Sequence, residues 1–145
     1  MNKSWFIGAL LLMSCSTNNN NWQDLDLKAF SISIPKQWHY QEEQGEDSFV
    51  GEIVGPKIIL NFDYSAMGYA NHFEDFSTEE NIQIDSTNKF VTKIIWPKII
   101  GKGITGIYIH SLNSNLNFQM NGENLTSKDQ KLALQAFKTI KLKDK

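Results

Sequence analysis

The chain has 145 residues, of which 41% are hydrophobic and 21% are charged, and its formal net charge is −2. These values fit one globular domain with a single core and exclude a largely disordered chain. Every basic residue is a lysine, and the lysines form no basic stripe, so we expect no nucleic-acid partner.

Residues 1–14 have the layout of a secretory signal peptide. Lys3 is followed by the apolar run Trp5–Met13, which is too short to span a bilayer because a transmembrane helix needs roughly 20 residues. The end of this segment, Leu12-Met13-Ser14-Cys15, resembles the lipobox of bacterial lipoproteins. The resemblance implies that residues 1–14 are removed and that Cys15 is acylated, for instance with palmitate. Ordinary signal cleavage that leaves a free thiol, or a cysteine in the core, are the alternatives.

Residues 15–23 are interpreted as a flexible tether. They contain four consecutive asparagines, which offer no apolar surface to bury. A tether of this length keeps the following domain within about 15 Å of the lipid surface. We therefore expect a membrane-anchored lipoprotein of the bacterial cell envelope, on the periplasmic face or the outer membrane. Which membrane holds it stays open.

The body of the chain alternates apolar and polar residues, which predicts half-buried strands. Phe30–Ile34 is the clearest example, and Pro35 ends it because proline lacks the backbone donor of a strand ladder. Further strands are expected around Trp38–Tyr40, Phe49–Val54, Lys57–Asp63, Asn81–Asp85, Phe90–Trp96, Gly103–His110 and Leu116–Met120. The dipeptide Asn121-Gly122 predicts the next turn.

One helix is predicted near the end of the chain. Thr126 or Ser127 can cap it, and the following Ala133, Ala136 and Phe137 recur at helical spacing. The pattern indicates a single α+β domain over residues 24–145, with an antiparallel sheet of about six to seven strands and the helix packed on one face.

The stretch Phe30–Trp38, the strand ending Asn61–Ser65 and the closing Ala136–Lys141 resemble small secreted proteins of the Mog1/PsbP-like α/β sandwich type. The likeness extends over about residues 30–142. It implies a non-enzymatic binding or accessory module, as several bacterial lipoproteins of this type are.

Residues Tyr64–Glu80 break the strand pattern and are predicted to form a long loop. Loops of this length without secondary structure are uncommon unless they are functional or mobile, so we expect the contact surface here. Exposed aromatic residues in a loop favour a protein, peptide or glycan partner. The candidate binding residues are Asp63, Tyr64, Tyr69, His72, Phe73, Glu74, Asp75, Phe76 and Asp85.

The sequence carries no catalytic signature. The three histidines, His39, His72 and His110, are too far apart for a recognisable metal motif, and the loop acids lack the spacing of an EF-hand. No Gly-x-Ser-x-Gly elbow and no phosphate-binding glycine loop occur. We expect no catalytic residue, no metal and no cofactor.

The expected function is therefore that of a lipid-anchored envelope protein that binds a partner, such as another envelope protein, without transforming it. Two alternatives stay open. One is a small envelope hydrolase acting on glycan or peptide, which needs two carboxylates, or His72 and a carboxylate, to meet in a pocket. The other is an immunity or accessory protein of a secretion system.

Overall fold

The computed structural model describes residues 21–66 and 79–143. This part of the chain contains strands that alternate with short turns and one helix near the end. The elements are β1 (Trp22–Asp26), β2 (Phe30–Pro35), β3 (His39–Glu42), β4 (Phe49–Gly55), β5 (Ile58–Ser65), β6 (Glu80–Ser86), β7 (Phe90–Pro97), β8 (Ile104–Ser111), β9 (Asn117–Glu123), α1 (Ser127–Phe137) and β10 (Lys141–Leu142).

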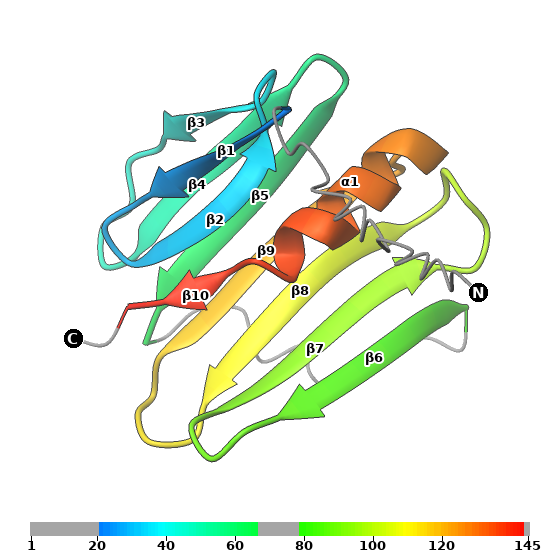
Figure 1. Cartoon of the computed structure of the whole chain (residues 1–145). Helices are drawn as coiled ribbons and strands as arrows, with labels where there is room; N and C mark the ends of the chain where they lie inside the picture. The colour runs from blue at the N-terminus through cyan, green and yellow to red at the C-terminus, as the bar shows by residue number, and fades with distance from the viewer. Residues whose placement is uncertain (1–20, 67–78, 144–145) are drawn as a thin grey trace, which may run out of the picture.

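The strands form two antiparallel sheets that face each other. The larger has seven strands in the order β3-β4-β5-β9-β8-β7-β6, and the smaller has three in the order β1-β2-β10. The small sheet and α1 lie side by side on one face of the large sheet (Figure 1). The α+β class, the antiparallel strands and the C-terminal helix are thus confirmed, whereas a separate three-stranded sheet was not predicted.

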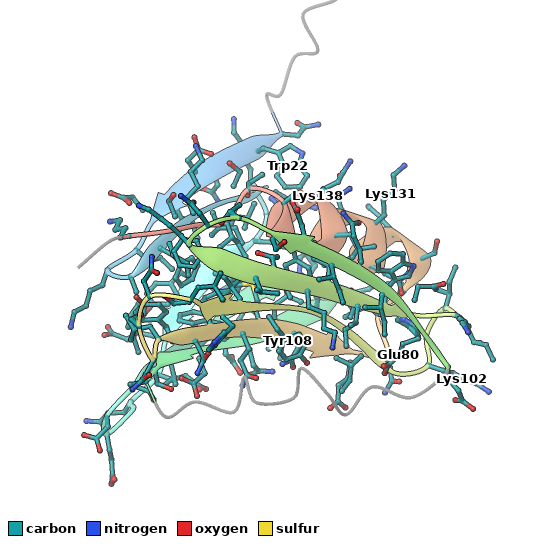
Figure 2. The ribbon with its side chains drawn as sticks, turned by 90° about the horizontal axis from the view of Figure 1, so that it is seen from below. Trp22, Glu80, Lys102, Tyr108, Lys131 and Lys138 are labelled. Carbon is teal, nitrogen blue, oxygen red and sulfur yellow. The ribbon has the colours of Figure 1, made fainter. Side chains whose placement is uncertain are left out.

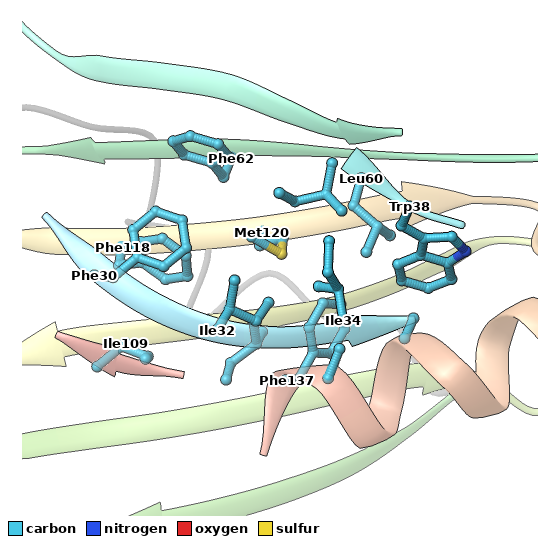
Figure 3. Packing of buried hydrophobic residues seen from close by; sticks show 14 of the residues in the cluster. Phe30, Ile32, Ile34, Trp38, Leu60, Phe62, Ile109, Phe118, Met120 and Phe137 are labelled. Atoms are coloured by element: carbon cyan, nitrogen blue, oxygen red, sulfur yellow. The ribbon is translucent and has the colours of Figure 1, made fainter. Parts of the chain in front are cut away.

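The core fills the space between the two layers. Phe30, Ile32 and Ile34 of β2 point toward the large sheet, and none is more than 1% exposed. They meet side chains such as Phe62 of β5 and Phe118 of β9, while α1 adds its own apolar residues beside them (Figure 3). Period-two alternation places one side of each strand in this core, which is why the strands were readable from the sequence.

The helix begins as predicted. The Thr126 hydroxyl accepts a hydrogen bond from the Asp129 backbone N–H at 3.2 Å and donates one to the Asp129 carboxylate at 2.7 Å. These two bonds cap the first turn. Ala133, Ala136 and Phe137 are buried, so the predicted apolar stripe is the face that packs.

The turn predicted at Asn121-Gly122 is wrong, because both residues lie inside β9. A side chain at Gly122 would place a Cβ 2.8 Å from the Leu60 side chain and 2.9 Å from the Ile59 carbonyl oxygen. Glycine is therefore required for a close approach between strands, not for a turn. The chain turns after β9, where Asn124 has a φ of 52°.

Two boundaries also differ from the expected ones. β5 continues to Ser65 and β6 begins at Glu80, so both ends of the predicted loop at 64–80 belong to strands. At the start of the chain, β1 begins at Trp22, within the range interpreted as a tether. Trp22 packs against the core cluster, which explains why the strand starts there.

Candidate functional site

The predicted site residues are only partly among the described residues. Those outside them are Cys15, Tyr69, His72, Phe73, Glu74, Asp75 and Phe76. Asp63 and Tyr64 lie in β5, and Asp85 lies in β6.

Asp63 and Tyr64 are neighbours in sequence, so their side chains point to opposite faces of the large sheet. Tyr64 faces the core layer and is 6% exposed, whereas Asp63 lies on the far face. Asp85 is in register with Tyr64 but is separated from it by β9, β8 and β7. Four strand spacings amount to about 19 Å. The three residues therefore do not form one site.

A large hollow that borders Tyr64 lies where the two sheets part. We call it the end groove. It has a volume of about 1050 Å³, which is large enough for several side chains of a ligand. It is lined by Asp26, Leu27, Lys28, Ala29, Tyr40, Glu42, Glu43, Gln44, Gly45, Glu46, Asp47, Ser48, Phe49, Val50, Tyr64, Ser65, Ala66, Leu116 and Lys143.

Aromatic rings form the floor of the end groove. Tyr40 of β3, Phe49 of β4 and Tyr64 of β5 line it, and the first two are only partly buried. The Phe49 and Phe62 ring centroids lie 5.3 Å apart, and those of Phe62 and Phe30 lie 5.0 Å apart. The floor is thus the outer end of an aromatic cluster that continues into the core. Such a floor is held rigid by packing and offers its remaining surface to a ligand.

The rim of the end groove is mainly acidic. The β3 end and the following loop supply its acids, Glu42, Glu43, Glu46 and Asp47. On the opposite side Lys143 pairs with Asp26, with 2.7 Å between Nζ and Oδ1. Partial burial, and secondarily the Glu42 charge, raise the pKa of Tyr40, which keeps its hydroxyl protonated as a donor. The charge and the aromatic floor suit a ligand with cationic groups.

Ser65, at the end of β5, carries an unusual buried hydroxyl. It is 7% exposed, and among the described residues its Oγ is a buried atom without a hydrogen-bond partner. A buried hydroxyl without a partner costs free energy, so native proteins rarely keep one. Ser65 follows Tyr64 in β5, so its side chain points to the face of the large sheet that carries Asp63 and away from the aromatic floor of the groove.

The far face of the large sheet carries a second polar arrangement. The pairing register aligns Asp63, Gln119, Tyr108 and Lys93 in one row across β5, β9, β8 and β7. Burial, and secondarily the charge of Glu80, raise the pKa of Tyr108. Figure 2 shows Tyr108 and Glu80 on the side of the sheet away from α1. Asp63 Oδ1 and Glu80 Oε2 are buried atoms for which no partner is found among the described residues.

The described histidines are not brought together. His39 lies in β3 and His110 in β8, with three strands of the sheet between them. His110 Nδ1 lies 2.6 Å from the Asn117 side-chain oxygen, a contact within the sheet face. Residues 21–66 and 79–143 contain no group of three or more metal-ligating His, Cys, Asp or Glu side chains. In the same residues no helix is long and apolar enough to cross a membrane.

No model of a known protein family matches the chain, and no curated protein matches it.

Sequence reasoning placed Tyr64 at a site but missed most of the end groove. The acidic stretch at 42–47 forms the end of β3 and the loop that follows it, and its local sequence does not show that it borders a groove. That Tyr40 and Phe49 stand beside Tyr64 follows from the β3-β4-β5 pairing, in which Phe49 lies opposite Tyr64. The strands at Phe49–Val54 and Lys57–Asp63 were predicted, but the contacts between their rings depend on a register that alternation alone does not fix.

Proposed function

We propose that this chain is a lipid-anchored binding protein of the cell envelope, built as a Mog1/PsbP-like α/β sandwich. It holds a basic, partly apolar peptide segment of a partner protein in the end groove. The observation that carries the proposal is the aromatic floor of this groove beneath an acidic rim.

The groove supports binding in three ways. The exposed parts of Tyr40 and Phe49 provide flat apolar surface. The aliphatic stems of lysine or arginine side chains pack on such a surface, and their positive charge is attracted to the faces of the rings. The acids of the rim attract a positive segment and align it. The Tyr40 hydroxyl, which stays protonated, supplies a hydrogen-bond donor beside the apolar floor, a combination typical of ligand sites.

The anchor and the finer fold assignment are supported by sequence. Leu12–Cys15 has the residue pattern of a lipobox, and the asparagine-rich stretch after it leads directly into β1. The quoted Mog1/PsbP-like motifs coincide with β2, with the end of β5 and with the passage from α1 to β10.

Binding is tested with two acetylated pentapeptides, Lys-Trp-Lys-Trp-Lys and its glutamate counterpart, titrated into the full chain and followed by NMR. We expect the lysine peptide to shift the signals of Tyr40, Phe49 and Ser65, and the glutamate peptide to leave them in place. Asp47→Lys should weaken the lysine peptide about fivefold, since an exposed charge contributes roughly 1 kcal/mol at most.

Asp85→Lys is the matched control, because it makes the same charge change on a strand distant from the groove. The proposal is wrong if both peptides bind equally, or if Asp85→Lys weakens binding as much as Asp47→Lys does.

The anchor has its own test. Cells given a clickable fatty acid should label the wild-type chain and leave Cys15→Ala unlabelled. Label that survives the substitution would disprove acylation at Cys15 without affecting the binding proposal.

A further inference from the structure

The large sheet ends in an open edge at β6. This strand pairs only with β7, so the backbone groups on its other side have no strand partner in the described part of the chain. Ile82 and Ile84 on it are 44% and 62% exposed. An edge strand with exposed apolar side chains is a template for pairing with another strand.

The other sheet edges are protected in ways that β6 is not. β3 has four residues and β10 has two, which leaves little length for pairing. β1 has five residues and carries Asp24 and Asp26, whereas the two acids of β6, Glu80 and Asp85, lie toward the ends of a longer strand. β6 has seven residues and neither lysine nor proline, the residues that most often block edge pairing.

We propose that β6 is a self-association edge, at which a second copy of this chain pairs antiparallel with β6 and joins the two large sheets into one. The sequence of β6 is self-complementary about Gln83. In this register Ile82 faces Ile84 of the other copy, and Gln83 faces its own counterpart. Asn81 then faces Asp85, and Glu80 faces Ser86. Apolar residues meet apolar ones, and no two like charges stand opposite each other.

Shifted registers lose this match. Pairing about Ile82 places the Glu80 carboxylate against Ile84, which buries a charge beside an apolar side chain. A shift by one residue places one isoleucine opposite Gln83 and the other opposite Asn81 or Asp85, so that apolar side chains of one copy stand beside polar ones of the other. Among these antiparallel registers, the pairing about Gln83 is the one that sets both isoleucines of each copy opposite an isoleucine of the other.

On β7, behind β6, one apolar and one basic residue lie opposite the two isoleucines. Ile82 lies opposite Ile95, which is fully buried, and Ile84 lies opposite Lys93. In the dimer Ile82 and Ile84 of the two copies would form an apolar cluster at the new junction. A pair of seven-residue strands buries less area than a standard stable interface of about 1,200 Å² or more, so the association is expected to be weak.

Self-association is measured on the full chain carrying Cys15→Ala, so that an acyl chain cannot contribute. Sedimentation equilibrium from micromolar to millimolar concentration should show a monomer–dimer equilibrium. Ile84→Lys should lower the association constant at least tenfold, because it places two ammonium groups at the junction. Ile59→Lys is the matched control: Ile59 is 49% exposed but lies on β5, and its substitution should leave the constant unchanged.

The register is tested by disulfide cross-linking of Gln83→Cys and Asp85→Cys in the same background, with an added oxidant that takes up the two thiol hydrogens. Directly paired residues have Cα atoms about 4.5–5.5 Å apart, within disulfide range. Gln83→Cys should therefore form a covalent dimer, and Asp85→Cys should not. A chain that stays monomeric throughout, a dimer that Ile84→Lys leaves intact, or stronger cross-linking through Asp85→Cys would each overturn the proposal.

Discussion

Replacing Ser65 with alanine should make the protein more stable. Most substitutions at buried positions destabilise, so the sign of this change is informative. Ser65 is 7% exposed and its Oγ lacks a partner among the described residues, so the folded state keeps a hydroxyl away from both water and protein. This hydroxyl points to the face of the large sheet that carries Asp63, and its burial is a stability cost of the fold.

The magnitude follows from that cost. Burying an unpaired hydroxyl destabilises by about 1–3 kcal/mol, whereas the single oxygen atom returns a few tenths of a kcal/mol in dispersion contacts. Ser65→Ala should therefore raise the free energy of unfolding by about 1 kcal/mol. For a domain of this size the melting temperature should rise by about 3–5 °C.

Urea unfolding of the full chain, followed by tryptophan fluorescence, measures the effect. Ser111→Ala is the matched control, because Ser111 is 8% exposed but its hydroxyl accepts a hydrogen bond from Ser114 at 2.9 Å. This control should lose about 0.5–1.5 kcal/mol. If Ser65→Ala also loses stability, the hydroxyl is satisfied in the free protein and the reasoning from an unpaired buried hydroxyl is wrong.

Three further predictions concern the fold. Phe62→Ala should lower the unfolding free energy by about 3–5 kcal/mol because four rings pack on Phe62. Ile59→Ala on the same strand is the control and should change it by no more than about 0.5 kcal/mol. Equal losses would contradict the aromatic cluster. Burial and the Glu80 charge raise the pKa of Tyr108 above its ordinary 10.0, so the folded state holds the phenol proton more tightly than the unfolded state does. This contributes to the free energy of unfolding in full below pH 10, and the contribution is lost as the pH rises above the folded-state pKa. Tyr108→Phe should flatten this loss in urea titrations at about pH 9 and about pH 11, and an unchanged slope would exclude Tyr108 as its source. Thr126→Ala should lower the unfolding free energy by about 1 kcal/mol, and no loss in thermal unfolding would mean that the cap is not needed.

The strands were predictable because each has one buried and one exposed side. In β5, Leu60 and Phe62 are buried while Ile59 and Asn61 are exposed, and this alternation is visible in the sequence. The helix was predictable because its cap and its apolar stripe are local patterns. The division into two sheets was not, since it depends on β2 pairing with β1 and β10 and not with the hairpin that follows it.

The candidate site was harder to predict because it depends on which strands become neighbours. Asp63, Tyr64 and Asp85 flank one loop in the sequence, yet they lie on two faces and on distant strands. Conversely, Tyr40 and Phe49 join Tyr64 only because three strands pair in a particular register. The β6 register about Gln83, by contrast, can be written down from the sequence once β6 is known to be an edge.

The most direct test of the proposed function is photo-cross-linking in native cell envelopes, with benzoylphenylalanine placed at Phe49 or at Ile59 of the full chain. Phe49 lines the end groove, and Ile59 lies on the other face of the large sheet. We expect one protein to cross-link through the Phe49 position, and the Lys-Trp-Lys-Trp-Lys peptide to compete with it. Cross-links that form only through the Ile59 position, or that the lysine peptide does not reduce, would contradict binding in the groove.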